Sequence, residues 1–239
     1  MINNFWDLTL PPNYYDKNLL DGLKKNKGIQ TNWHNITFLE VKSRLSNDYK
    51  HLDFACGPGT FIGNYFNSQS IGVDISTNQI NFAKKKYSDI GTFYTIDNFE
   101  LGKYKNYFEQ ITVIGLIEYL DDAETEELIK NLLSILKTNG KIIFTTPNYG
   151  SSMYFIEKLM HVFGPINYSD LHKNRYNYRK LKDKFEKFKV KNYKIKKIIN
   201  IGIVLSIFNL TLGKGAVNLI SRILGYKLGY LFLIEVIKE

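Results

Sequence analysis

The sequence has one cysteine, Cys56, and five prolines among its 239 residues. A single cysteine cannot form an internal disulfide framework, and such scarcity is typical of a reducing compartment. The longest apolar run begins at Ile201 and is interrupted by Asn209, before the roughly 20 residues that a membrane-spanning helix needs. We find no basic segment followed by an apolar one near the N-terminus, and so no signal peptide. These absences predict a cytoplasmic protein.

Acidic residues are few relative to basic ones: 32 lysines and arginines face 23 aspartates and glutamates, a formal net charge of +9. The excess is local, because residues 173–197 contain twelve basic and two acidic side chains. Two interpretations stay open, a solvated lysine-rich surface and a surface for anionic lipid or a phosphorylated acceptor. The apolar stretch 201–224 follows directly. A peripheral contact with the inner membrane face would therefore involve residues 173–224.

Other partners are less well indicated. No recognised RNA-binding module accompanies the positive charge, which argues against nucleic acid as a partner. No carboxylate–histidine cluster suggests a metal site. Nothing in the sequence indicates an oligomeric state.

Short apolar segments alternate with helical patterns through the first two thirds of the chain. Strands are expected near 50–54, 71–74, 92–96, 110–114 and 141–145. Such alternation predicts parallel βαβ units with right-handed crossovers, and therefore an α/β fold with a doubly wound sheet. We expect residues 1–30 to be irregular, because Pro11 and Pro12 block a helix. A helix from Asp121 to Leu136 should stop at Asn139-Gly140.

An acid ends each of three consecutive predicted strands: Asp53, Asp74 and Asp97. The first strand runs into a turn with Gly57 and Gly59, which allow a sharp bend and close approach of a ligand. Ligands of doubly wound sheets bind beyond the carboxyl ends of the strands, so these residues predict a binding site there.

The glycine spacing argues against two common nucleotide-binding motifs. A nicotinamide fingerprint, Gly-x-Gly-x-x-Gly, would place its third glycine at Ile62, but the glycine stands at Gly63. No phosphate-binding Gly-x-x-x-x-Gly-Lys-Ser/Thr motif occurs at the turn either.

As a set, these motifs resemble the class I S-adenosylmethionine-dependent methyltransferases. The resemblance rests on Leu52–Thr60 as the first motif, Ile71–Ser76 as the ribose-binding segment, Ile114–Leu120 at the fourth strand and Leu136–Asn148 at the fifth. It implies a Rossmann-like, mostly parallel seven-stranded sheet with helices on both faces and an antiparallel last strand. It also implies S-adenosyl-L-methionine as cofactor and S-adenosyl-L-homocysteine as product. The residues it assigns to the cofactor are Asp53, Ala55, Cys56, Gly57, Gly59, Asp74, Ile75, Asp97, Asn98, Gly115 and Leu116.

The same resemblance suggests an acceptor site. Asp170–Tyr178 is similar to the His-x-Arg-x-Tyr-Ser segment of small-molecule methyltransferases, with Asn174 where an arginine is usual. His172 is then the candidate general base, although a structural histidine is the alternative. The expected acceptor-binding residues are Tyr14, Trp33, Glu118, Tyr119 and Tyr176.

The expected organisation is a single domain, 1–239. It comprises a cap segment and helix (1–47), a cofactor-binding core (48–147), an acceptor lid (148–189), and C-terminal strands and apolar helices (190–239). The predicted reaction is methyl transfer to oxygen or carbon of a small apolar, lipid-like or envelope sugar acceptor. A cofactor-binding protein without transfer activity and a nicotinamide oxidoreductase remain as alternatives.

Overall fold

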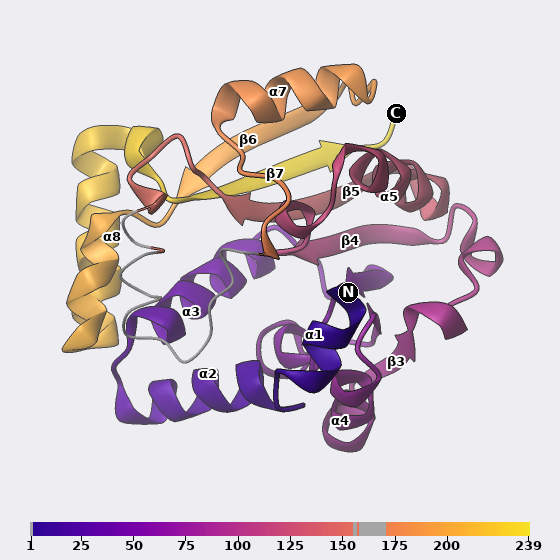
Figure 1. Cartoon of the computed structure of the whole chain (residues 1–239), viewed down its shortest axis with the longest axis horizontal. Coiled ribbons are helices and arrows are strands. Elements are labelled where there is room, and N and C mark those ends of the chain that lie inside the picture. Colours follow the sequence, from indigo (N-terminus) through magenta and orange to yellow (C-terminus); the bar gives the residue numbers. More distant parts are fainter. Residues whose placement is uncertain (1, 155–156, 158–170) are drawn as a thin grey trace.

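The computed structural model describes residues 2–154, 157 and 171–239. A seven-stranded sheet in the order β3-β2-β1-β4-β5-β7-β6 runs through them (Figure 1). The strands are β1 (His51–Phe54), β2 (Ser70–Asp74), β3 (Gly91–Thr95), β4 (Phe108–Ile114), β5 (Leu136–Pro147), β6 (Tyr193–Ile198) and β7 (Leu231–Ile237). Strands β1 to β5 are parallel, whereas β7 is antiparallel to β5 and β6. The predicted α/β fold with an antiparallel last strand is confirmed.

The helices cover both faces of the sheet (Figure 1). They are α1 (Ile2–Leu8), α2 (Tyr14–Lys25), α3 (Ile29–Lys42), α4 (Thr77–Tyr87), α5 (Asp122–Ile135), α7 (Tyr178–Lys187) and α8 (Leu210–Leu224). A π-helical segment, η1 (Ile62–Phe66), follows the glycine turn. Short 3₁₀ segments are η2 (Ile96–Asn98), η3 (Leu101–Tyr104), η4 (Ile117–Tyr119), η6 (Ile201–Ile207) and η7 (Gly225–Leu228).

Helix starts follow local side-chain chemistry. The Ser76 hydroxyl accepts from the Gln79 N–H at 3.2 Å, and the Asn177 side chain accepts from the Lys180 N–H at 2.8 Å. These side chains are the N-caps of α4 and α7. Helix α5 begins with a reciprocal capping box between Asp121 and Glu124.

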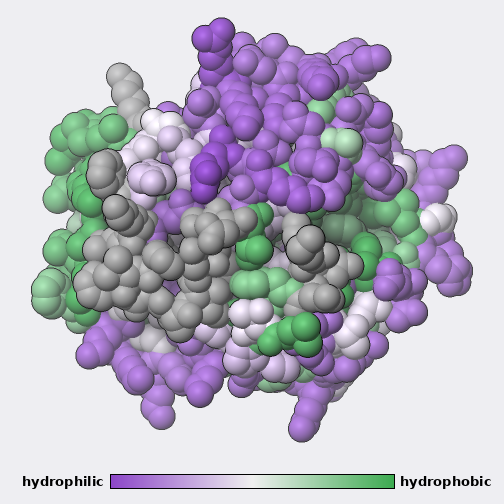
Figure 2. All heavy atoms as spheres, in the orientation of Figure 1, coloured by the Kyte–Doolittle hydropathy of each residue, from purple (hydrophilic) through white to green (hydrophobic). Residues whose placement is uncertain are grey.

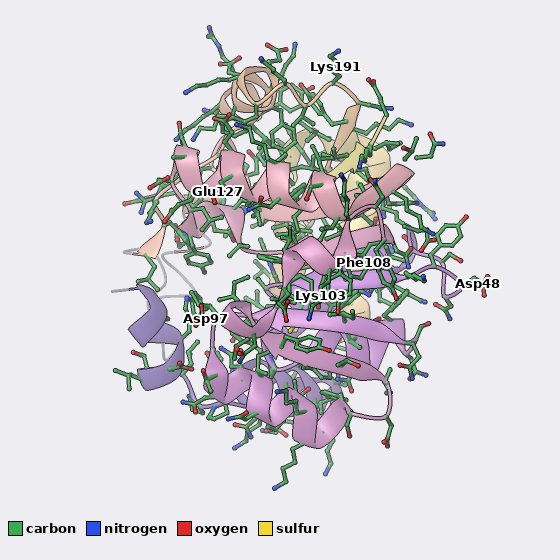
Figure 3. All side chains as sticks on the ribbon, turned by 90° about the vertical axis from the view of Figure 1, so that its right-hand side faces the viewer. Asp48, Asp97, Lys103, Phe108, Glu127 and Lys191 are labelled. Atoms are coloured by element: carbon green, nitrogen blue, oxygen red, sulfur yellow. The ribbon has the colours of Figure 1, made fainter. Side chains whose placement is uncertain are left out.

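The strand order reverses at β1, which pairs in parallel with β2 on one side and with β4 on the other. Such a switch point leaves a crevice beyond the carboxyl ends of the strands. In Figure 3, Asp97 and Glu127 lie toward this end of the molecule, and Asp48, just before β1, lies at the other.

Two details of the sequence-based prediction are wrong. Residues 1–30 are not irregular: Pro11 and Pro12 lie between α1 and α2 rather than preventing helix formation. Helix α5 ends at Ile135, within one residue of its expected end, but β5 begins directly at Leu136 rather than after Asn139-Gly140. Leu136 is fully buried and pairs with Phe108 of β4, so tertiary packing ends the helix before the asparagine–glycine signal.

Most of the expected acceptor lid lies outside the described residues. The sequence also predicts a helix between Ser151 and Phe163, and most of that stretch, with His161, belongs to this part. Of the lid, the structure describes 148–154, 157 and 171–189.

Candidate functional site

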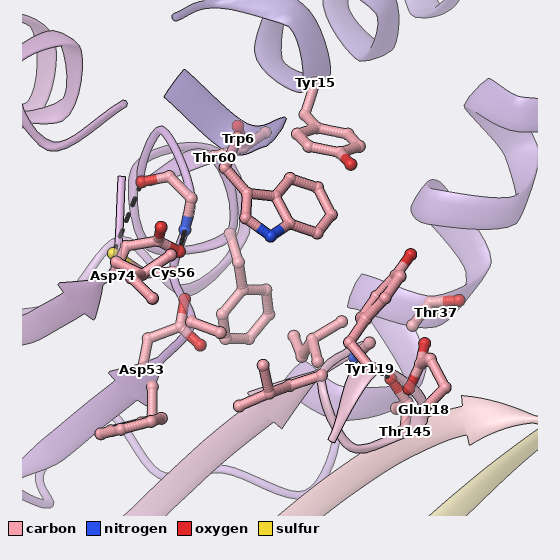
Figure 4. Close-up of a pocket in the computed structure, with 18 of the residues that line it drawn as sticks. Trp6, Tyr15, Thr37, Asp53, Cys56, Thr60, Asp74, Glu118, Tyr119 and Thr145 are labelled. Carbon is pink, nitrogen blue, oxygen red and sulfur yellow. Dashed lines mark hydrogen bonds between the residues drawn. The ribbon is translucent and has the colours of Figure 1, made fainter. Parts of the chain in front are cut away.

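A cavity of about 610 Å³ opens at the carboxyl ends of the central strands (Figure 4). One side is formed by the glycine turn and by the ends of β1 and β2. The opposite side is formed by η4, Glu157 and His172, while α1, α2 and α3 contribute aromatic side chains between them. One space therefore joins the predicted cofactor and acceptor residues.

The turn after β1 has an unusual backbone. Ala55, Gly57 and Gly59 have φ angles of 65°, 54° and 75°, in the left-handed region that favours glycine. The N–H groups of Ala55 and Cys56 both donate to the Val73 carbonyl, at 2.7 and 3.0 Å, which ties the turn to β2. A Cβ on Gly59 would come within 2.9 Å of the Phe93 ring. The glycines thus permit both the turn and its close packing.

The Asp74 carboxylate is held by the turn that it faces. One oxygen accepts from the Gly57 N–H at 2.8 Å and the other from the Ser76 N–H at 2.9 Å. Burial raises the pKa of Asp74, although these backbone donors oppose the shift, and the charge of Asp7 adds to it. Both oxygens are oriented, and each keeps a second lone pair for a ligand hydroxyl.

Asp53 ends a chain of buried polar side chains. Its carboxylate accepts from the Thr112 hydroxyl at 2.6 Å, and that hydroxyl lies 2.9 Å from His51 Nε2. His51 Nδ1 lies 3.0 Å from the Ser70 hydroxyl. Burial raises the pKa of Asp53 to about 7; the Thr112 hydrogen bond opposes this and the Asp74 charge adds to it. Asp53 is therefore positioned by Thr112 of β4, and it is only partly ionised at neutral pH.

The other side of the cavity carries a histidine with two polar neighbours. His172 Nδ1 lies 2.6 Å from the Tyr149 hydroxyl and 3.2 Å from Glu157 Oε1. Tyr149 donates to Glu157 at 3.0 Å. Burial alone would raise the pKa of Glu157, but the hydrogen bonds from His172 and Tyr149 lower it, so this carboxylate is anionic. Because the tyrosine proton goes to Glu157, His172 donates from Nδ1, which selects the imidazole tautomer with its lone pair on Nε2.

Glu118 lies close to this histidine. It is 4 % exposed, and burial raises its pKa to about 7, opposed in part by the backbone and by the charge of His172. Asn174 holds the two together: its N–H donates to the Glu118 carbonyl at 3.0 Å and its side chain to the Leu120 carbonyl at 2.7 Å. The residue that departs from the expected arginine is thus a buried link between the His172 segment and η4.

An aromatic group closes the space between the two sides. The rings of Trp6 and Tyr119 meet edge-on with centroids 5.3 Å apart, and Tyr119 also lies 4.9 Å from the His172 ring. Figure 4 shows Trp6 between the acids Asp53 and Asp74 on one side and Tyr119 on the other.

Most of the predicted site residues line this cavity. They are Tyr14, Trp33, Asp53, Ala55, Cys56, Gly57, Asp74, Ile75, Gly115, Leu116, Glu118, Tyr119 and His172. Four others do not. Gly59 faces Phe93, Asp97 and Asn98 are exposed on η2, and Tyr176 is buried in the core with its hydroxyl 3.5 Å from the Ile117 carbonyl.

Sequence reasoning missed several lining residues: Trp6, Thr60, Gln79 and Glu157. Thr60 directly follows Gly59, and Gln79 stands five residues after Asp74, so proximity to the motifs indicates both. Trp6 and Glu157 lie outside every motif, and no sequence pattern marks them.

Comparison with known proteins identifies the family. The methyltransferase domain family matches residues 23–194. The chain belongs to this family.

The chain therefore carries a methyltransferase domain. Ubiquinone biosynthesis O-methyltransferase of Coxiella burnetii is 29 % identical over 131 residues, covering 52 % of this chain and 55 % of the relative. The chain thus spans about half the length of the curated relatives it matches.

Two solved structures share the fold. A possible histamine N-methyltransferase from Thermotoga maritima has a TM-score of 0.60 at 16 % identity, covering 85 % of this chain and 88 % of that one. Magnesium protoporphyrin IX methyltransferase from Synechocystis, with bound SAH, has a TM-score of 0.55 at 13 % identity, covering 91 % and 87 %.

The cavity of this methyltransferase has polar atoms for a cofactor. Within the described residues, Thr60 Oγ1, Gln79 Oε1 and Glu118 Oε2 are buried without a hydrogen-bond partner, and all three residues line the cavity. A buried unpaired polar atom costs about 1–3 kcal/mol, so a polar ligand that reached these atoms would be favoured. The residues present therefore fit S-adenosylmethionine.

Proposed function

We propose that this methyltransferase uses S-adenosyl-L-methionine to methylate an oxygen of an apolar, lipid-like small molecule. The observation that carries the proposal is the single cavity that contains Asp53 and Asp74 at one end and His172 and Glu118 at the other. Similarity to an enzyme named for O-methylation in ubiquinone biosynthesis supports oxygen as the target atom. The family match favours methyl transfer over the nicotinamide alternative.

At the cofactor end, Asp74 would hold the ribose hydroxyls, because a carboxylate presents two acceptors to a diol. Asp53 and the backbone of the glycine turn would hold the amino-acid portion. S-adenosylmethionine would supply a sulfonium methyl group for in-line attack by the acceptor oxygen, with S-adenosylhomocysteine as the leaving group. The chain then has to orient the acceptor, exclude water and remove one proton.

At the acceptor end, Glu157 and Tyr149 would fix the orientation and tautomer of His172. With its proton on Nδ1, the imidazole can accept the acceptor's proton at Nε2. The unpaired Glu118 oxygen offers a hydrogen bond to the acceptor hydroxyl. Tyr119, Trp6 and Trp33 supply the apolar surface against which such a molecule would lie.

The cofactor assignment is tested by Asp74→Ala. Removal of this carboxylate deletes two charge-assisted hydrogen bonds, so we expect affinity for S-adenosylhomocysteine to fall about 100-fold. Isothermal titration calorimetry measures the change, with Asp89→Ala, an exposed carboxylate, as the matched control. Unchanged affinity of the Asp74 variant, or tight binding of a nicotinamide dinucleotide by the wild type, would overturn the assignment.

A further inference from the structure

The connection between β6 and β7 carries three helical elements, η6, α8 and η7. Helix α8 packs one side on the protein, with Leu210, Gly213 and Val217 buried. The Asn32 amide of α3 donates to the Ser206 hydroxyl at 2.7 Å and to the Leu210 carbonyl at 2.9 Å. The connection is therefore fixed to α3 by buried hydrogen bonds.

The outer side of this connection is apolar. Nine exposed large apolar side chains lie between Ile201 and Leu228, against seven in the rest of the described chain. We call these nine the apolar face: Ile201, Leu205, Ile207, Phe208, Leu212, Leu219, Ile223, Leu224 and Leu228. Phe208 and Ile223 are 75 % and 70 % exposed. Figure 2 shows hydrophobic side chains gathered over α8 at the left edge of the molecule.

The residue spacing on α8 explains how this helix is apolar both on the side that faces the protein and on the exposed side. Leu212, Leu219 and Ile223 share one face, because seven and eleven residues are close to whole helical turns. This stripe is distinct from the buried side with Gly213 and Val217. The three side chains of this stripe are mostly exposed. Large contiguous apolar patches on soluble proteins mark interaction sites.

The charge around the apolar face has one sign. No aspartate or glutamate occurs between Glu186 and Glu235, whereas nine lysines and arginines do. Lys214 and Arg222 are exposed on α8 itself. A second copy of the same face would bring like charges together, which disfavours self-association. Apolar side chains bordered by basic ones suit anionic lipid, where the former enter the acyl boundary and the latter contact the headgroups.

The length of the elements limits the depth of any such contact. Helix α8 has 15 residues, fewer than the roughly 20 required to span a bilayer. Among the described residues, no helix combines the length and apolarity needed to cross a membrane. The connection suits a position along the surface of a bilayer rather than across it.

We infer that the apolar face, with Lys214 and Arg222, is a docking surface for an anionic lipid bilayer. Docking does not depend on the methyl-transfer chemistry. Its consequence for catalysis rests on the proposed function: α3, which holds α8 through Asn32, also lines the cavity with Trp33 and Thr37. Docking would bring the α3 wall of the acceptor cavity close to the lipid in which an apolar acceptor is dissolved.

The test is co-sedimentation of the full chain with phosphatidylcholine vesicles, with and without phosphatidylglycerol. We expect binding to the anionic vesicles, weakened by salt. The triple change Leu212→Ser, Leu219→Ser and Ile223→Ser should lower the partition coefficient about tenfold or more. Lys214→Gln with Arg222→Gln should lower it on anionic vesicles only, whereas Lys84→Gln with Lys85→Gln, exposed on α4, should not change it.

A second measurement does not depend on weakened binding. Cys56 is buried, so Leu219→Cys provides an exposed thiol for an environment-sensitive dye. Anionic vesicles should shift its emission to shorter wavelength, and a dye at Lys84→Cys should not respond. No binding of the wild type at low salt would overturn the inference. So would a wild-type dimer that the triple change dissociates, because a second copy would then occupy the face. Since calorimetry with S-adenosylhomocysteine needs no vesicles, failure of docking and failure of the proposed function are distinguishable.

Discussion

At the scale of the residue, the sequence predicted the acids and the glycine turn better than their surroundings. Asp53 and Asp74 stand at strand ends, where a doubly wound sheet collects its ligands, so position alone indicated their location. The structure adds the partners that orient them, such as Thr112 for Asp53. Glu157 stands 15 residues before His172, and no sequence pattern predicts the 3.2 Å contact between them.

His172 is the residue whose substitution should separate chemistry from cofactor binding. His172→Gln removes the proposed base but leaves Asp53 and Asp74 intact. We expect the turnover number to fall about 10²- to 10⁴-fold, with affinity for S-adenosylhomocysteine unchanged. Transfer of a labelled methyl group to an organic-solvent extract of bacterial membranes measures turnover, and calorimetry measures affinity.

His161→Gln is the control, because the motif does not include this histidine. If His172→Gln kept full turnover, the histidine would be structural. If the wild type bound the cofactor but labelled no product in any extract, the chain would be a binding protein without transfer activity.

At the scale of the element, the alternation of strands and helices was sufficient to predict the parallel half of the sheet. It could not predict α1 and α2, because Pro11 and Pro12 are equally compatible with a loop and with a junction between helices. The docking of α1 depends on a long-range contact. The Asp7 carboxylate accepts from the Ser76 hydroxyl at 2.5 Å and from the Asn78 N–H at 3.2 Å, at the N-terminus of α4.

Asp7 should therefore control how long the cofactor stays bound. Its neighbour Trp6 lines the cavity, so release of α1 would open that side. We expect Asp7→Ala to raise the dissociation rate of S-adenosylhomocysteine about tenfold, as the loss of two hydrogen bonds to a charged group implies. Asp7→Asn keeps an acceptor oxygen and should stay close to the wild type. Stopped-flow tryptophan fluorescence measures both rates. Equal rates in all three proteins would show that α1 does not gate the site.

At the scale of the whole molecule, buried titratable groups make stability depend on pH in opposing ways. Burial raises the pKa of Asp53 and of Glu118 to about 7, and it lowers the pKa of His34 to about 4 and, with the charge of Lys42, that of His51 to about 3. Between about pH 4 and 6.5 the two carboxyls make the free energy of unfolding fall as pH rises, because they keep their protons only in the folded state. The two histidines make it rise with pH, because they are protonated only in the unfolded state. These contributions oppose one another in the wild type, so a single group is best measured by difference between the wild type and a variant.

Asp53→Asn should make one of these contributions measurable. A carboxyl with a pKa of 3.8 when unfolded and about 7 when folded retains its proton only in the folded state between those values. The free energy of unfolding therefore falls as pH rises through this window, and the full cost is present above pH 7. Removing the charge should stabilise the apo protein by about 2–4 kcal/mol at pH 8, and by little at pH 4.5. Urea unfolding at both pH values measures this, with exposed Asp97→Asn as the control. Asp53→Asn should also bind S-adenosylhomocysteine weakly, because the charge that destabilises the apo protein is the one proposed to hold the cofactor. An equal gain at both pH values would instead attribute the effect to packing.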